Sequence, residues 1–260
     1  MRGKKAPKTY YYQSFTDDFV TSKNQDQKLP SAYSWSHNSW GFRWLSRFLY
    51  GLFWLFGVFY CKWGLHVTVK NRKVLKPYRH QGYFVYGNHT QPVGDVFTPL
   101  QVMAPKRTYM MAGMANLGIP VLGKLIPIAG ALILPDSIHQ MGQFNREIES
   151  LIQRNQAVTI YPEAHVWPYY TKIRPFPDGA FHYPVQTQAA AFAMTTTYQK
   201  RRWGSKPRLT VYVDGPFLPD QTLNKKDQRK KLNQEVHDCM VMRSKESHYE
   251  TVHYQRGRDS

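Results

Sequence analysis

The chain contains 260 residues, 42% apolar and 20% charged, so it can build a substantial core and is not a disordered chain. Lysine and arginine number 35 against 17 acidic residues. The resulting net charge of +18 favours anionic partners: a membrane, nucleic acid or anionic small molecules. The two cysteines, Cys61 and Cys239, are too few for a disulfide-rich secreted scaffold or a four-cysteine zinc site.

Residues 1–34 are polar, with scattered aromatic side chains and many turn-forming residues. We expect them to form a partly ordered N-terminal arm. The chain starts with basic residues that no apolar stretch follows, so a secretory signal is not expected. The expected location is the cytosol or the cytoplasmic face of the cell membrane.

Residues 35–63 contain five of the seven tryptophans and a charge-free apolar run from residue 48 to residue 61. A helix of this run is about 21 Å long, whereas a membrane span needs about 20 apolar residues. One interpretation is a buried core helix. The other is a membrane-interface anchor, because Trp and Tyr flank the run and Arg43, Arg47 and Lys62 bracket it. We predict a membrane-interface helical element over residues 35–63, bound peripherally or monotopically.

Residues 64–243 alternate between short apolar runs and helical patterns, which predicts one α/β domain with a largely parallel, helix-flanked sheet. The expected strands are 65–69, 83–86, 131–134, 158–161, 192–197 and 209–213. The expected helices are 137–155, 179–190 and 224–243, the first capped by Asp136 or Ser137. Residues 244–260 show no pattern and are predicted to be a mobile tail.

Asn88, His89 and Asp95 follow the apolar run 83–86. A histidine at the end of a strand, with a carboxylate a few residues later, suits a general base whose tautomer the carboxylate fixes. Open α/β sheets place their sites at strand ends. A single histidine and aspartate in a loop also occur at structural or surface positions, so the pair needs support from other residues.

Two further groups of residues follow later strands. Glu163 and His165 come directly after the run 158–161, and Lys172 and Arg174 lie in a basic turn that leads into a predicted helix. Cations beside a helix N-terminus suit an anionic group, although a solvated surface turn explains Lys172 and Arg174 equally well.

The order of these segments resembles the glycerolipid acyltransferase family, whose bacterial type member is 1-acylglycerol-3-phosphate acyltransferase. The family has four blocks: NHxxxxD, a GxxFIxR-like block, FPEGTR and a late strand that contains proline. Asn88, His89 and Asp95 resemble the first block, residues 130–134 the second, and Pro162 and Glu163 the third. The resemblance covers about residues 65–215.

The sequence departs from this pattern in each block. Five residues separate His89 from Asp95, where the family has four, so the pair needs a one-residue bulge in order to form. Pro135 and Asp136 stand in place of the family's arginine in the second block. Residues 164–166 are Ala-His-Val instead of Gly-Thr-Arg, and the fourth block, 195–198, lacks proline. Both arginines that the family uses to hold the acceptor phosphate are therefore missing.

The resemblance implies transfer of an acyl chain from acyl-CoA or acyl carrier protein to a hydroxyl of a lysophospholipid. In this interpretation His89 is the general base and Asp95 orients it. Asn88 and amides of residues 90–94 support the oxyanion, and Glu163 orders the acceptor or the loop that carries His89. His165, Lys172 and Arg174 are the candidates to hold the phosphate. The chemistry needs no metal or other cofactor. The implied partners are an anionic membrane surface, the lysophospholipid acceptor, and acyl-CoA or acyl carrier protein.

Other functions remain open from the residues alone. The basic segments 200–203 and 225–231 suit nucleic acid, but no nucleic-acid-binding motif is present. A serine hydrolase lacks its GxSxG elbow, and a metal site of His89, Asp95, Glu163 and His165 lacks HExxH-type spacing. An acyltransferase with a phosphate-free acceptor, or an inactive homologue that only binds lipid, fits the missing arginines.

Overall fold

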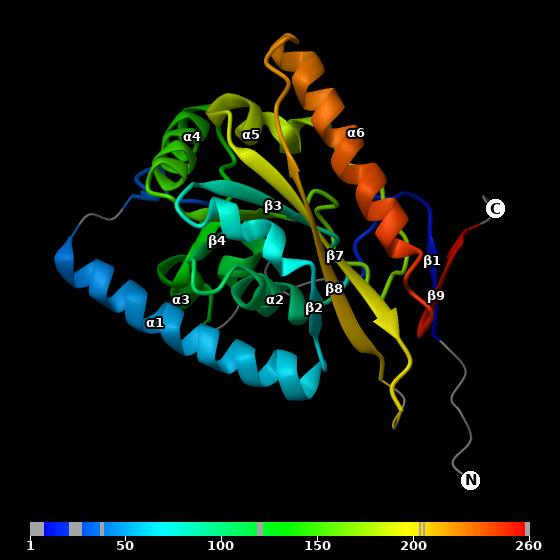
Figure 1. Cartoon of the computed structure of the whole chain (residues 1–260). Helices are drawn as coiled ribbons and strands as arrows, with labels where there is room; N and C mark the ends of the chain where they lie inside the picture. The colour runs from blue at the N-terminus through cyan, green and yellow to red at the C-terminus, as the bar shows by residue number, and fades with distance from the viewer. Residues whose placement is uncertain are drawn as a thin grey trace.

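The computed structural model describes residues 8–20, 28–36, 39–118, 122–202, 204 and 206–257. Its centre is a seven-stranded sheet in the order β2-β8-β7-β3-β6-β4-β5 (Figure 1). The strands are β2 (Thr68–Lys70), β3 (Tyr83–Gly87), β4 (Thr108–Ala112), β5 (Ala131–Ile133), β6 (Ala157–Ile160), β7 (Ala190–Gln199) and β8 (Arg208–Phe217). Only β7 and β8 pair antiparallel, so the predicted α/β class with a largely parallel sheet is confirmed.

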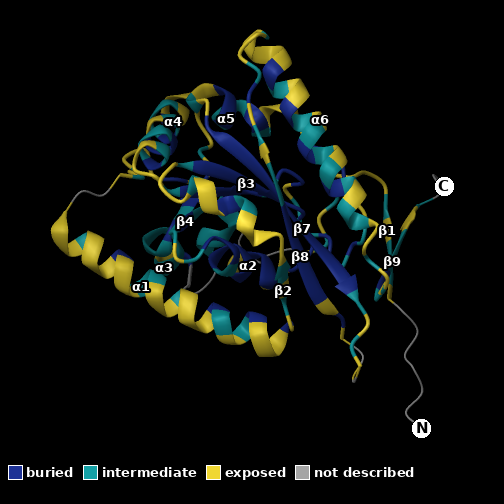
Figure 2. Ribbon diagram, viewed as in Figure 1, coloured by how far each residue is buried: buried dark blue, intermediate teal, exposed yellow. Residues whose placement is uncertain are grey.

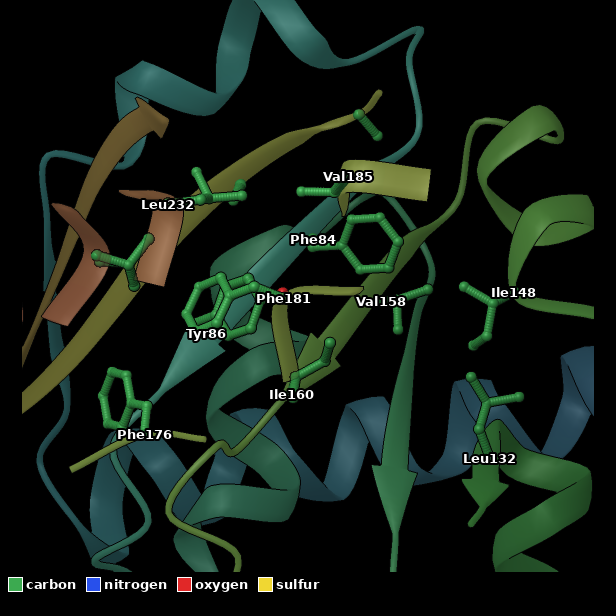
Figure 3. Packing of buried hydrophobic residues seen from close by; sticks show 14 of the residues in the cluster. Phe84, Tyr86, Leu132, Ile148, Val158, Ile160, Phe176, Phe181, Val185 and Leu232 are labelled. Atoms are coloured by element: carbon green, nitrogen blue, oxygen red, sulfur yellow. The ribbon is translucent and has the colours of Figure 1, made fainter. Parts of the chain in front are cut away.

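Helices cover both faces of this sheet. The α-helices after the first are α2 (Gly94–Met103), α3 (Leu122–Ala129), α4 (Ile138–Gln153), α5 (His182–Thr187) and α6 (Lys225–Ser244). Short 3-10 helices cover Arg72–Tyr78, Met114–Gly118 and Asp178–Phe181. Side chains of α4, α5 and α6 pack on one face of the sheet, around Phe84 and Val158 (Figure 3). Side chains of α2 pack on the other face, around Val85 and Phe192.

Local sequence signals account for most of these boundaries. Ser137 caps α4 by accepting a hydrogen bond from the Gln140 amide, and Asn224 caps α6 in the same way. The predicted helix 179–190 is shorter in the structure, because Gln188 adopts φ +52° and ends α5. Helices α2 and α3 and strand β4 were not predicted from the sequence. Two of these, α2 and α3, have prolines within them, and the side chains of β4 are mostly half-buried.

Helix α1 spans Trp40–Phe59 and continues as a π-helical turn, Tyr60–Gly64. By length and composition Trp40–Gly64 could cross a membrane, and 17% of its most apolar window is buried. The helix is therefore longer than its charge-free run. Because its outer face is exposed (Figure 2), it does not match the core-helix interpretation.

The two chain ends form a second, two-stranded sheet. Strand β1 (Lys8–Tyr12) pairs parallel with β9 (Val252–Arg256), with Tyr10 opposite Tyr254. These strands lie beside α6 at one side of the molecule (Figure 1). The prediction of a mobile tail over residues 244–260 is therefore wrong for residues 252–256. The pairing partner lies at the other end of the chain, so no local pattern reveals it.

Candidate active site

His89 and Asp95 form a hydrogen-bonded pair at the C-terminal end of β3. The Nδ1 atom of His89 lies 2.8 Å from Asp95 Oδ2, and the two side chains are 21% and 3% exposed. The same Asp95 oxygen accepts hydrogen bonds from the amides of Thr90 and Gln91, at 2.8 and 2.9 Å. Because Nδ1 faces the carboxylate, Nε2 is the nitrogen that can take a proton from a substrate.

The loop between these residues accommodates the additional residue in a tight turn. The amide of Asp95 donates to Gln91 O at 3.2 Å, and α2 begins at Gly94. A Cβ atom on Gly94 would lie 2.7 Å from the end of the Leu65 side chain, so a larger residue at this position would require Leu65 to move. Buried Tyr198 of β7 supports the loop, with its hydroxyl 2.6 Å from Thr90 Oγ1 and 3.0 Å from Gln91 Nε2.

Two features stabilise the charge and the orientation of the pair. Asp95 lies in the first turn of α2, where the helix dipole favours a carboxylate. The imidazole of His89 stacks on Tyr161, with ring centroids 4.5 Å apart. The Tyr161 hydroxyl donates to the Asp95 carbonyl at 2.6 Å. Burial raises the pKa of Tyr161 well above its usual range, so this hydroxyl stays protonated.

Glu163 binds the backbone of His89 through a hydrogen bond. Its Oε2 accepts the His89 amide at 2.9 Å and the Arg174 Nη2 at 3.0 Å, while Oε1 accepts the Arg174 amide at 2.9 Å. The side chains of Glu163 and Arg174 are 0% and 1% exposed. Of the roles expected for Glu163, ordering the loop that carries His89 matches its placement.

Arg174 does not lie where a substrate could reach it. Its guanidinium also donates to the carbonyls of Phe15 and His165 and lies over the Trp167 ring, 4.8 Å from the ring centroid. The prediction that Arg174 holds an acceptor phosphate is therefore wrong for this structure. Every one of these partners is internal, and the side chain is buried.

The remaining candidates lie closer to solvent. Lys172 is exposed, and the imidazole of His165 is 40% exposed. His165 Nδ1 lies 3.7 Å from Asp18 Oδ2, so an acidic side chain stands beside the position where the family pattern has threonine.

Asn88 has a structural position. Its amide exchanges two hydrogen bonds with the backbone of Thr196 in β7, at 2.8 and 3.0 Å, and the side chain is buried. The expected oxyanion role therefore does not fit Asn88. It does not fit the Thr90 and Gln91 amides either, because Asp95 accepts their hydrogen bonds.

The site also depends on four side chains that were not predicted from the sequence: Gln91, Tyr161, Trp167 and Tyr198. Tyr161 stands immediately before Pro162 and Glu163, and this position was the one available signal. The other three act through contacts with distant segments. Within the described ranges, no group of three or more His, Cys, Asp or Glu side chains is placed to hold a metal ion.

Comparison with known proteins relates this geometry to a family. Residues 66–197 match the family model described as Acyltransferase. A search of curated proteins gave no match. Among solved structures, the chain resembles 1-acyl-sn-glycerophosphate (LPA) acyltransferase, PlsC, from Thermotoga maritima. The TM-score is 0.54 and the identity 16%, over 75% of this chain and 79% of that chain. At this identity the likeness shows a shared fold.

Proposed function

The chain belongs to the Acyltransferase family, and we propose that it moves a fatty acyl chain from a thioester donor to a lysophospholipid hydroxyl. The donor is acyl-CoA or acyl carrier protein, and the acceptor is a lipid such as 1-acylglycerol-3-phosphate. The observation that supports this proposal best is the 2.8 Å pair of His89 and Asp95, at a strand end within the matched segment.

In the proposed mechanism, His89 Nε2 takes the proton of the acceptor hydroxyl as its oxygen attacks the thioester carbonyl. The negative charge of Asp95 stabilises the imidazolium that forms. The tetrahedral intermediate then collapses, the carbon–sulfur bond breaks, and the imidazolium returns the proton to the leaving thiolate. No covalent acyl-enzyme is required, and no resident cofactor or metal takes part.

The oxyanion of the intermediate needs hydrogen-bond donors other than Thr90 and Gln91. The next amides along the loop belong to Val93 and Gly94, at the N-terminal end of α2. Pro92 has no amide hydrogen. We assign the oxyanion to the amides of Val93 and Gly94, because the first amides of a helix have no partner within the helix and the helix dipole favours negative charge there.

A phosphate-free acceptor is a second candidate. Arg174 is buried, and Asp18 lies 3.7 Å from His165, so a negative side chain stands beside one of the two remaining candidates to hold a phosphate. A phosphorylated acceptor would then depend on Lys172 and on His165 in its charged form. An acceptor with a neutral or cationic head group would tolerate Asp18.

The membrane is the proposed location of the acceptor and the proposed partner surface. The outer face of α1 exposes Trp44, Phe48 and Leu52 among other apolar side chains. Basic Arg201, after β7, lies beside the π-helical turn that follows α1, because its Nη2 donates to Gly64 O at 2.7 Å. Both features suit an anionic leaflet at the cytoplasmic face. Nucleic acid is not proposed as a partner; Trp203 of the basic segment lies outside the described residues.

A lipid mass-spectrometry assay tests the choice of substrates. Purified protein in mild detergent receives labelled acyl-CoA or acyl carrier protein, together with lysophosphatidic acid or a panel of phosphate-free hydroxyl lipids. Phosphatidic acid that depends on Lys172, with Lys73→Ala as the exposed control, supports the phosphorylated acceptor. Product from phosphate-free lipids alone supports the second candidate. No product from any pair would favour an inactive homologue that binds lipid.

A further inference from the structure

The two chain ends pack on the loop around Trp167, and this loop is hydrogen-bonded to the backbone of His89. Strands β1 and β9 both lie outside the matched residues 66–197, so they add to the family domain. We call the sheet of β1 and β9, with the turn of residues 13–20, the terminal clasp. Its contacts centre on Trp167, which is 0% exposed.

Rings from both ends of the chain surround Trp167. Tyr254 of β9 stacks on it with centroids 5.0 Å apart at 8°, and Tyr12 of β1 lies 4.9 Å away. Phe19 packs edge-on at 5.2 Å. Hydrogen bonds add to this packing: Trp167 Nε1 donates to Asp17 O at 2.8 Å, and the Tyr254 hydroxyl donates to Pro168 O at 2.9 Å.

Trp167 in turn contacts the site at two points. Its amide donates to the His89 carbonyl at 3.0 Å, and its ring lies against the Arg174 guanidinium. Arg174 holds Glu163, which accepts the His89 amide. Both backbone polar groups of His89 are therefore bonded to the loop that the clasp covers.

We infer that the terminal clasp positions the catalytic histidine, with Trp167, Tyr12 and Tyr254 as positioning residues. Without the clasp, water would reach Trp167 and the buried Glu163–Arg174 pair, and the bonds that fix the His89 backbone would weaken. The inference rests on the proposed role of His89 for its kinetic part only. The loss of order at residues 88–91 is expected whatever reaction the protein catalyses.

The test compares the Tyr12→Ala, Tyr254→Ala double variant with Tyr11→Ala. Tyr11 lies between Tyr10 and Tyr12 in β1, is 66% exposed and is a matched control for strand pairing. Tyr254→Phe keeps the stacked ring and removes only the hydroxyl. Exchange of backbone amides is followed by mass spectrometry in peptides that cover residues 88–91 and β3, and kcat and KM are measured for the substrate pair that the protein uses.

For the double variant we expect amide exchange at residues 88–91 to rise about tenfold while β3 stays protected. We expect kcat to fall about tenfold or more, with KM changed less than about threefold, because a misplaced base affects the chemical step. We expect Tyr254→Phe to keep amide exchange and kcat close to their wild-type values, and Tyr11→Ala to change neither. Unchanged exchange at residues 88–91 in a folded double variant would overturn the inference.

If the double variant unfolds, the single variant Tyr12→Leu is judged by the same criteria. If the wild type has no activity, the proposed function fails and the exchange measurement alone decides on the clasp.

Discussion

Asp95 performs two tasks at once in the loop after β3. One carboxylate oxygen fixes the His89 ring and also accepts the amides of Thr90 and Gln91, which shape the turn. Hydrogen bonds to a charged acceptor contribute about 1.5–3 kcal/mol each when buried. Asp95 therefore preorganises the base as well as stabilising its charged form, and this combination explains how the pair tolerates an additional residue in the loop.

Ala164 adopts φ +62°, a left-handed conformation that costs a residue with a Cβ atom about 1–2 kcal/mol. The family pattern has glycine at this position. We predict that Ala164→Gly raises the free energy of unfolding by about 0.5–1 kcal/mol, because glycine relieves the strain at a modest cost in entropy. Urea unfolding followed by circular dichroism measures the change. A destabilised Ala164→Gly variant would show that the strain estimate is wrong.

Helix α1 has an inner face that packs on the domain and an outer apolar face that is exposed. Its inner side packs on the domain through buried Ser46 and Gly57; a Cβ on Gly57 would lie 3.0 Å from Phe97. Its outer side leaves Phe48 64% and Leu52 48% exposed. A wide unpartnered apolar face on a helix indicates an interaction surface.

We predict that the Phe48→Asp, Leu52→Asp variant loses most of its binding to vesicles, because two charges on the outer face oppose burial among lipids. Flotation with vesicles that contain phosphatidylglycerol measures binding, and circular dichroism checks the fold. Ile138→Asp, at a position 94% exposed on α4, is the matched control. Flotation equal to that of the wild type would contradict the assignment of this face.

At the scale of elements, periodicity and caps predict most of the large domain, because α4, α6 and the buried strands bury a regular stripe or run of side chains. They miss β1 and β9, because each pairs only with the other end of the chain. They also misassign Arg174. A basic residue in a proline-rich turn resembles a surface residue until the fold places Glu163 beside it. The dyad is predictable from residue types, whereas its support by Tyr198 and Trp167 depends on contacts that no local pattern encodes.

The charge of the whole molecule, +18, adds a long-range attraction to the contacts of α1. We predict that binding to anionic vesicles weakens as salt rises from 0.05 to about 0.5 M, because the Debye length falls from about 14 Å to about 4 Å. Residual binding at high salt should come from the apolar face of α1. Vesicle sedimentation across a salt series, with zwitterionic vesicles as the control, measures both contributions. Binding to anionic vesicles that does not depend on salt would contradict a role for the net charge.

In the proposed mechanism, the pair of His89 and Asp95 performs acyl transfer. The most direct test is the turnover of His89→Ala beside the wild type and His139→Ala, an exposed histidine on α4, with the substrate pair that gives product. We predict that His89→Ala lowers kcat by about 10² to 10⁴-fold, the range for loss of a general base. Circular dichroism and thermal unfolding should stay close to those of the wild type, and His139→Ala should keep full activity. A folded His89→Ala protein that turns over at the wild-type rate would contradict the mechanism.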